Sequence, residues 1–173
     1  MIKFNEKIKS LLVLAIKKTK AELDEKYKDD KLFGYALCTD DAVMTIYHIA
    51  CTNSWIKEQD DKYMIYSSVE WGQSGENSHF SEAYDEIYKD YENSDHEDGS
   101  FEINSDMRFE AMVQALKECK EEAIFDEDTL LSVASTDPSE ELLFLQMRGI
   151  DRLNSPKIAD ELASVLGIEK YRE

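Results

Sequence analysis

The acidic run at residues 82–106 contains the residue types from which a calcium site is built. It carries ten Asp or Glu residues and a single Lys, and Gly99 lies within it. A helix–loop–helix calcium site needs oxygen ligands at its first, third and fifth positions, Gly at the sixth and Glu at the twelfth. With Gly99 at the sixth position, Ser94 falls first, His96 third and Ser105 twelfth. The pattern fails, so we predict no calcium loop.

Other candidates for catalysis or metal binding are equally incomplete. His79, Glu82 and Glu86 could share one helix face and bind a metal, but a solvated helix start has the same composition. Residues 72–75 (GQSG) resemble the serine turn of hydrolases, except that the second Gly comes one residue early. His48 lies in an apolar stretch and fits a core histidine better than a base. We therefore predict no catalytic residue, no metal, no cofactor and no enzyme.

The tyrosines and carboxylates around residues 80–98 favour binding instead. Tyr84, Tyr88 and Tyr91 recur at helical spacing beside acidic residues. They fit either as core and boundary residues or as binding anchors ringed by charge, the usual anatomy of an interface hot spot. The predicted partner-binding set is Tyr84, Asp85, Glu86, Tyr88, Asp90, Tyr91, Glu92, Asp95, Glu97 and Asp98.

Charge is distributed unevenly along the 173 residues, whose formal net charge is −18. Residues 1–31 carry a net charge of +3, which leaves −21 on residues 32–173. Such a surface repels nucleic acid and anionic membranes and attracts basic proteins. We therefore expect a partner with a basic surface, no nucleic-acid partner and no membrane partner. The N-terminal Lys residues fit a solvated helix face, or could contact the acidic part of the same protein.

The composition indicates where in the cell the protein is expected and how many domains it forms. The longest apolar run, Leu11–Ile16, is too short to span a membrane. The N-terminus superficially resembles a signal peptide but lacks a small-residue cleavage site, so a mature helix is expected. Three cysteines (Cys38, Cys51 and Cys119), without a CxxC pair, indicate reduced core thiols and a cytoplasmic protein. With 42% hydrophobic residues, residues 1–173 are expected to form a single domain.

Hydrophobic periodicity places these residues on an α+β fold. The pattern predicts a long N-terminal helix over about residues 2–27. It predicts about four strands forming an antiparallel sheet, at residues 32–40, 42–52, 63–67 and 129–136, with a tight turn at Thr39–Ala42. Further helices are expected from about Ser54, over 80–92, from Ser105 or Asp106, after Asp137-Pro138, and from Ser155-Pro156 to Gly167, making about five or six in all.

The order of these features resembles a bacterial family catalogued as domain of unknown function 4303. The resemblance covers roughly residues 3–166 and rests on the strand pair FGYALCTDDAVMTIY, Trp55, SSVEW and Phe80 opening an acidic helix. Its most specific parts are the TDD turn at Thr39–Asp41 and the pair Glu70-Trp71. The resemblance implies a small bacterial protein with no catalytic residues to carry over. By analogy, many small acidic bacterial proteins act as immunity proteins against secreted toxins.

The leading hypothesis is therefore an immunity protein that neutralises a cognate toxin by direct binding through its acidic surface. A nucleic-acid mimic that inhibits a DNA-binding protein would share this surface and differ only in its partner. An enzyme with an unrecognised site would need a pocket containing carboxylates with strongly perturbed pKa values. An acidic housekeeping domain is the remaining alternative.

Overall fold

Three strands form the centre of the molecule in the computed structural model, which describes residues 2–72, 77–93 and 100–172. The middle strand is β1 (Leu32–Thr39). Strand β2 (Tyr47–Thr52) pairs with it in the antiparallel direction, and β3 (Leu130–Ser135) pairs with it in the parallel direction. The sheet is therefore mixed, with the order β2-β1-β3.

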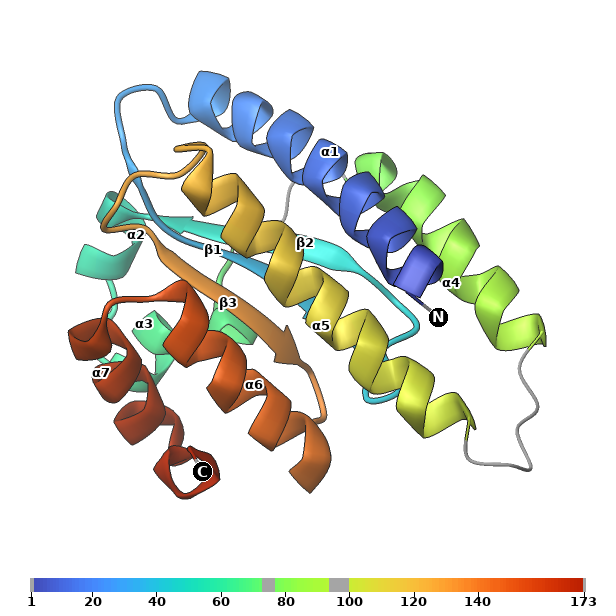
Figure 1. The fold of residues 1–173 in the computed structure, drawn as a ribbon. Helices are drawn as coiled ribbons and strands as arrows, with labels where there is room; N and C mark the ends of the chain where they lie inside the picture. The colour runs from blue at the N-terminus through green and yellow to red at the C-terminus, as the bar shows by residue number, and fades with distance from the viewer. Residues whose placement is uncertain (1, 73–76, 94–99, 173) are drawn as a thin grey trace.

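Helices cover both faces of this sheet (Figure 1). On one face lie α1 (Ile2–Lys26), α4 (Ser81–Asn93) and α5 (Ser100–Glu121). On the other lie α2 (Asn53–Lys57), α3 (Lys62–Tyr66), α6 (Glu140–Leu153) and α7 (Pro156–Leu166). Short 3₁₀ turns complete the described elements: η1 (Ser68–Glu70), η2 (Asn77–Phe80) and η3 (Glu169–Tyr171). Across the described ranges, no helix combines the length and the apolar character needed to cross a membrane.

Alternation along β1 divides the core into two layers. Tyr35 and Leu37 pack with the helices α1 and α5, whereas Ala36 and Cys38 pack with α6 and α7. All four side chains are fully buried. A strand that is apolar on both sides needs cover on both faces, and the helices provide it.

The structure confirms the predicted α+β class and corrects the sheet. Its described residues contain three strands, where about four were predicted, and the sheet is mixed, where an antiparallel one was predicted. Residues 63–67 were expected to form a strand, but Asp61 caps the short helix α3 by accepting the Tyr63 N–H at 2.8 Å. Strand β3 is parallel to β1, and the chain between them runs through β2 and the helices α2 to α5, as parallel strands need a long connection.

The helices and the loop after β1 also differ from the prediction, and α5 begins at Ser100, earlier than the expected Ser105 or Asp106. Seven α-helices are described, where five or six were expected, because α2 and α3 are separate single turns capped by Thr52 and Asp61. The predicted tight turn after Thr39 is a wider loop, and β2 begins at Tyr47. A side-chain cap satisfies the first N–H groups of a helix locally, which favours a helical turn over a strand in so short a segment.

Trp71, from the Glu70-Trp71 pair, packs against the sheet rather than facing solvent. A Cβ atom on Gly34 would lie 2.3 Å from the Trp71 ring, so only glycine leaves room for it in β1. The Trp71 Nε1 donates a hydrogen bond to the Ile65 carbonyl at 2.9 Å. This side chain therefore joins α3, η1 and β1 into one layer.

A candidate interaction surface on helix α4

Helix α4 packs against the core through its apolar face. Ala83 and Ile87 are buried, and Phe80 in the preceding turn η2 is buried with them. Phe80 stacks on His48, whose other face stacks on Tyr35, with 5.6 Å between ring centroids in both pairs. His48 therefore lies in an aromatic stack inside the core, as its apolar neighbours indicated.

Ion pairs fix the flank of α4 that lies beside α1. The Lys7 ammonium lies 2.5 Å from the Glu86 carboxylate, and Lys89 lies 3.0 Å from its other oxygen. The hydrogen bond from Lys7, followed by that from Lys89, lowers the pKa of Glu86 below its ordinary value. At the start of the helix, His79 Nε2 lies 2.6 Å from Glu22 Oε1. His79 therefore contacts α1. In the described residues it does not join Glu82 and Glu86 in a group that could hold a metal ion.

The end of α4 is anchored by an arginine that the sequence analysis did not single out. Arg108 of α5 is fully buried, and its guanidinium lies 3.3 Å from Asp90 Oδ2. It also donates hydrogen bonds to the carbonyls of Val43 and Ala42, both at 3.0 Å. Burial lowers the pKa of Arg108, while the Asp90 and Asp40 carboxylates oppose that shift. The sequence feature that could have indicated this role is the position of Arg108, a charged residue four positions before Met112 on the apolar side of the helix.

Asp40, in the TDD motif, shapes the loop that Arg108 holds. Its carboxylate accepts backbone hydrogen bonds from Ala42 at 3.1 Å, Met44 at 2.9 Å and Thr45 at 3.1 Å. Val43, in the middle of this loop, has a positive φ of 53°. The motif is therefore a structural one, since it turns carbonyl groups inward for Arg108 to bind.

The outer flank of α4 presents the tyrosine ladder, which consists of Tyr84, Tyr88 and Tyr91. Tyr84 is 40% exposed and Tyr88 43% exposed, so neither is a core residue. The Tyr84 and Tyr88 rings stack with centroids 6.1 Å apart, and Tyr88 and Tyr91 follow at 6.3 Å. Asp85 and Glu92 are exposed at three residues before and four after Tyr88, so they flank the ladder. The result is an ordered aromatic surface with a carboxylate rim.

The predicted binding residues therefore divide into three groups. Tyr84, Tyr88, Tyr91, Asp85 and Glu92 share the outer part of α4. Glu86 and Asp90 are ion-paired within the protein and hold the helix in place. Asp95, Glu97 and Asp98 lie outside the described residues.

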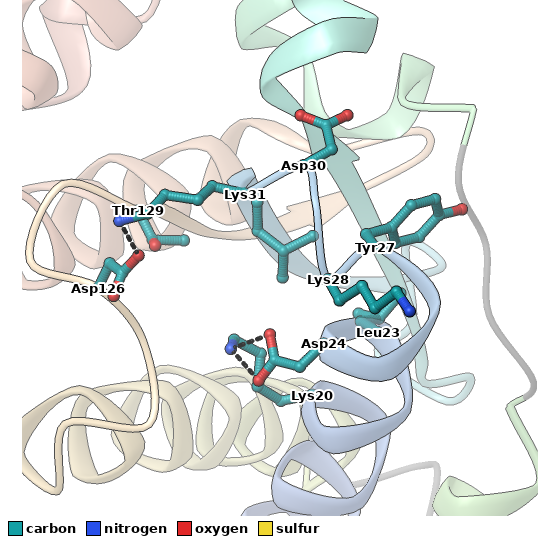
Figure 2. A pocket seen from close by; sticks show the side chains of 10 residues that line it. Lys20, Leu23, Asp24, Tyr27, Lys28, Asp30, Lys31, Asp126 and Thr129 are labelled. Carbon is teal, nitrogen blue, oxygen red and sulfur yellow. Dashed lines mark hydrogen bonds and ion pairs between the residues drawn. The ribbon is translucent and has the colours of Figure 1, made fainter.

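A polar cavity of about 280 Å³ lies between the end of α1, the start of β1 and the segment before β3 (Figure 2). Four of its six charged side chains form two ion pairs: Lys20 lies 2.6 Å from Asp24, and Lys31 lies 3.1 Å from Asp126. A hydrogen bond with Thr52 is the main cause that lowers the pKa of Asp30 in the same wall. A general acid at neutral pH needs a raised carboxyl pKa, so this carboxylate is unsuited to that task.

Within residues 2–72, 77–93 and 100–172, no three His, Cys, Asp or Glu side chains are grouped so that they could hold a metal ion. In α4, Glu86 and Asp90 are ion-pair partners, and Asp85 and Glu92 border the tyrosine ladder.

Comparison with known proteins gives a family and no annotated relative. Residues 12–155 match the family described as Domain of unknown function (DUF4303). No curated protein and no solved structure matches the chain.

Proposed function

Since the chain belongs to the DUF4303 family, whose description assigns no activity, we propose a function from the surface of α4. The protein is an acidic binding protein whose tyrosine ladder docks on a basic partner. Its partner is a bacterial toxin domain, which it neutralises as an immunity protein. The proposal rests on one observation: the tyrosine ladder is exposed and stacked, while the other sides of α4 are held by packing and ion pairs.

Exposed tyrosines on an ordered helix favour tight binding. Tyrosine is enriched among the residues that dominate interface energetics, because it buries a large surface and keeps a hydrogen-bonding hydroxyl. Helix α4 is already fixed by Ile87, by the Lys7–Glu86 pair and by the Asp90–Arg108 pair. Little conformational entropy is therefore lost when a partner covers the ladder.

The charge of the protein supports a basic partner. Asp85 and Glu92 border the ladder, and the whole chain has a formal net charge of −18. A strongly negative surface accelerates encounter with a cationic cleft and disfavours anionic partners. Toxin domains that bind nucleic acid or phosphate present such clefts, so an acidic rim around aromatic anchors suits their neutralisation.

The test measures binding of the purified protein to the product of the adjacent gene, by surface plasmon resonance at several salt concentrations. Replacing both Tyr84 and Tyr88 with alanine should weaken affinity at least tenfold, chiefly through faster dissociation. Reversing both Asp85 and Glu92 to lysine should slow association and reduce its salt dependence.

The matched control reverses Glu127 and Asp128 to lysine. Both are exposed in the segment after the 22-residue helix α5, whereas α4 contacts the first half of that helix through Arg108. The two double reversals change the net charge equally. If the control slows association as much as the α4 variant, general charge rather than this surface governs binding. Capture of a DNA-binding host protein instead of a toxin would favour the nucleic-acid mimic.

A further inference from the structure

A second concave surface lies at the ends of the two parallel strands, on the α6 and α7 side of the sheet. Strand β1 ends at Thr39 and β3 at Ser135, and these two residues are partners in the register. Beside them is a cavity of about 220 Å³, bounded by α3, η1, the segment after β3, α6, and the end of α7 with the residues that follow it. Open α/β sheets commonly bind ligands just beyond the carboxyl ends of their strands.

The lining of this cavity contains no charged residue, although 34% of the chain is charged. It comprises Tyr63, Ser67, Ser68, Val69, Ala134, Ser135, Thr136, Pro138, Leu143, Gln146, Leu166 and Ile168. A cation would find no counter-charge in this wall. An anion would likewise find no positively charged side chain there. The composition therefore selects an uncharged ligand.

Three polar side chains in the lining belong to residues with little exposed surface. Ser67 is 4% exposed, Ser68 3% and Gln146 8%. Within the part of the chain that the structure describes, none of these three side chains makes a hydrogen bond to another residue. Their polar atoms are not sealed from solvent, so these groups are hydrated when water fills the cavity. Their hydrogen-bonding capacity is thus directed to whatever fills the cavity.

We propose that this cavity binds a small uncharged molecule that presents an amide-type edge beside an apolar body. The Gln146 side chain offers a donor and an acceptor in one plane, which matches a ligand with an acceptor beside a donor. The Ser67 and Ser68 hydroxyls can each donate or accept. Val69, Leu143 and Leu166 supply the apolar wall. The volume corresponds to about seven waters at roughly 30 Å³ each, which suits a single-ring molecule.

This proposal is independent of the one for α4, since the two surfaces share no residue. The test is a nitrogen-15 chemical-shift titration of the full chain with benzamide, benzoate and benzamidinium. These three probes share one ring and differ in the charge of the attached group. Benzamide should give saturable shifts at the backbone amides of residues 67–69 and 134–136. The two charged probes should bind at least tenfold more weakly.

Variants then test the named side chains. Gln146→Met keeps the length of the side chain and removes its amide, and Ser68→Ala removes one hydroxyl. Each should weaken benzamide binding at least fivefold, while Ser164→Ala, on the exposed face of α7, should leave it unchanged. If Gln146→Met fails to fold, Ser68→Ala alone decides. The proposal is overturned if millimolar benzamide gives no saturable shifts, which means that water alone fills the cavity. It is equally overturned if benzoate binds as well as benzamide, or if the folded variants bind like the wild type.

Discussion

Arg108 is fully buried, although it stands among apolar side chains on the inward face of α5. Its guanidinium contacts three groups from two separate parts of the chain: Asp90 at the end of α4, and the carbonyls of Ala42 and Val43 in the loop between β1 and β2. A buried arginine is costly to desolvate, and only several simultaneous partners offset that cost. Its planar set of donors therefore explains why arginine rather than lysine occupies this position.

We expect Arg108→Met to destabilise the fold by about 3–5 kcal/mol, as is typical when one partner of a buried ion pair is removed. The reason is that Asp90 and the two loop carbonyls lose a donor in a region with little access to water. Urea denaturation followed by circular dichroism measures the change. Arg148→Met, at an exposed position of α6, is the control and should change the unfolding free energy by less than about 0.5 kcal/mol. Equal losses in the two variants would contradict this role for Arg108.

At the scale of an element, α4 shows why a charged helix can still be a fixed part of the fold. One side of it is apolar, and the flank toward α1 is held by Glu86, which pairs with Lys7. The remaining flank carries the tyrosine ladder and faces outward. The helix thus has three functional sides: one for packing, one for anchoring and one that we propose for binding.

The anchoring of α4 to α1 should depend on pH through Glu86. Its pKa is lowered from 4.5, chiefly by the hydrogen bond from Lys7, so the pair stabilises the folded state above about pH 4.5. This contribution is lost as the pH falls through the lowered folded-state pKa. We expect it to reach at most about 1 kcal/mol, because Lys7 is largely exposed.

Unfolding in urea between pH 7 and pH 3.5 tests this dependence. Wild-type stability should fall more steeply below pH 4.5 than that of Glu86→Gln. The exposed Glu92→Gln variant, in the same helix, serves as control and should follow the wild type. A wild-type curve parallel to that of Glu86→Gln would show that the pair does not stabilise the fold.

At the scale of the whole molecule, the basic N-terminal helix offsets part of the acidic charge internally. Lys7 pairs with Glu86 of α4, while Lys9 pairs with Glu118 and Lys17 with Glu122, on or directly after α5. The alternative in which the N-terminal lysines contact the acidic part of the same protein therefore holds for these three. Because these lysines are paired, the outward-facing acidic groups determine the electrostatic field around the protein.

The two core layers should unfold together if residues 1–173 form a single domain, as the composition predicts. Cys38 and Cys51 lie in the α6–α7 layer and Cys119 in the α1–α5 layer, and all three are buried. Burial raises the pKa of Cys38 and of Cys119 to about 12, and it also raises the pKa of Cys51. The native thiols should thus be unreactive at pH 8, since the thiolate is the nucleophile.

Labelling with a maleimide across a urea gradient, followed by peptide mass spectrometry, measures each thiol separately. One shared midpoint for the three cysteines is expected from a cooperative domain. A midpoint for Cys119 well separated from that of Cys38 and Cys51 would show that the layers unfold independently.

Most elements could be predicted from the sequence because their signals are local. The apolar spacing of α1 and the alternation around Tyr35 were sufficient to place a helix and a strand. The same spacing placed Tyr84 and Tyr88 on one side of α4, but left open whether that side was core or surface. The prediction was wrong in a short segment with alternating apolar residues, where the Asp61 cap favours the helix α3 over a strand.

By itself, the sequence determined the α+β class, the helical periodicity and the uneven charge, since each depends on neighbouring residues. Only the tertiary structure decided which side of each element is buried. It placed β3 parallel to β1, buried Arg108 against Asp90, and left Tyr84 and Tyr88 exposed. It also brought Ser68 and Gln146, far apart in the chain, to one uncharged cavity. These outcomes depend on which distant segments meet, because burial and pairing are set by contacts that the local spacing of residues does not encode.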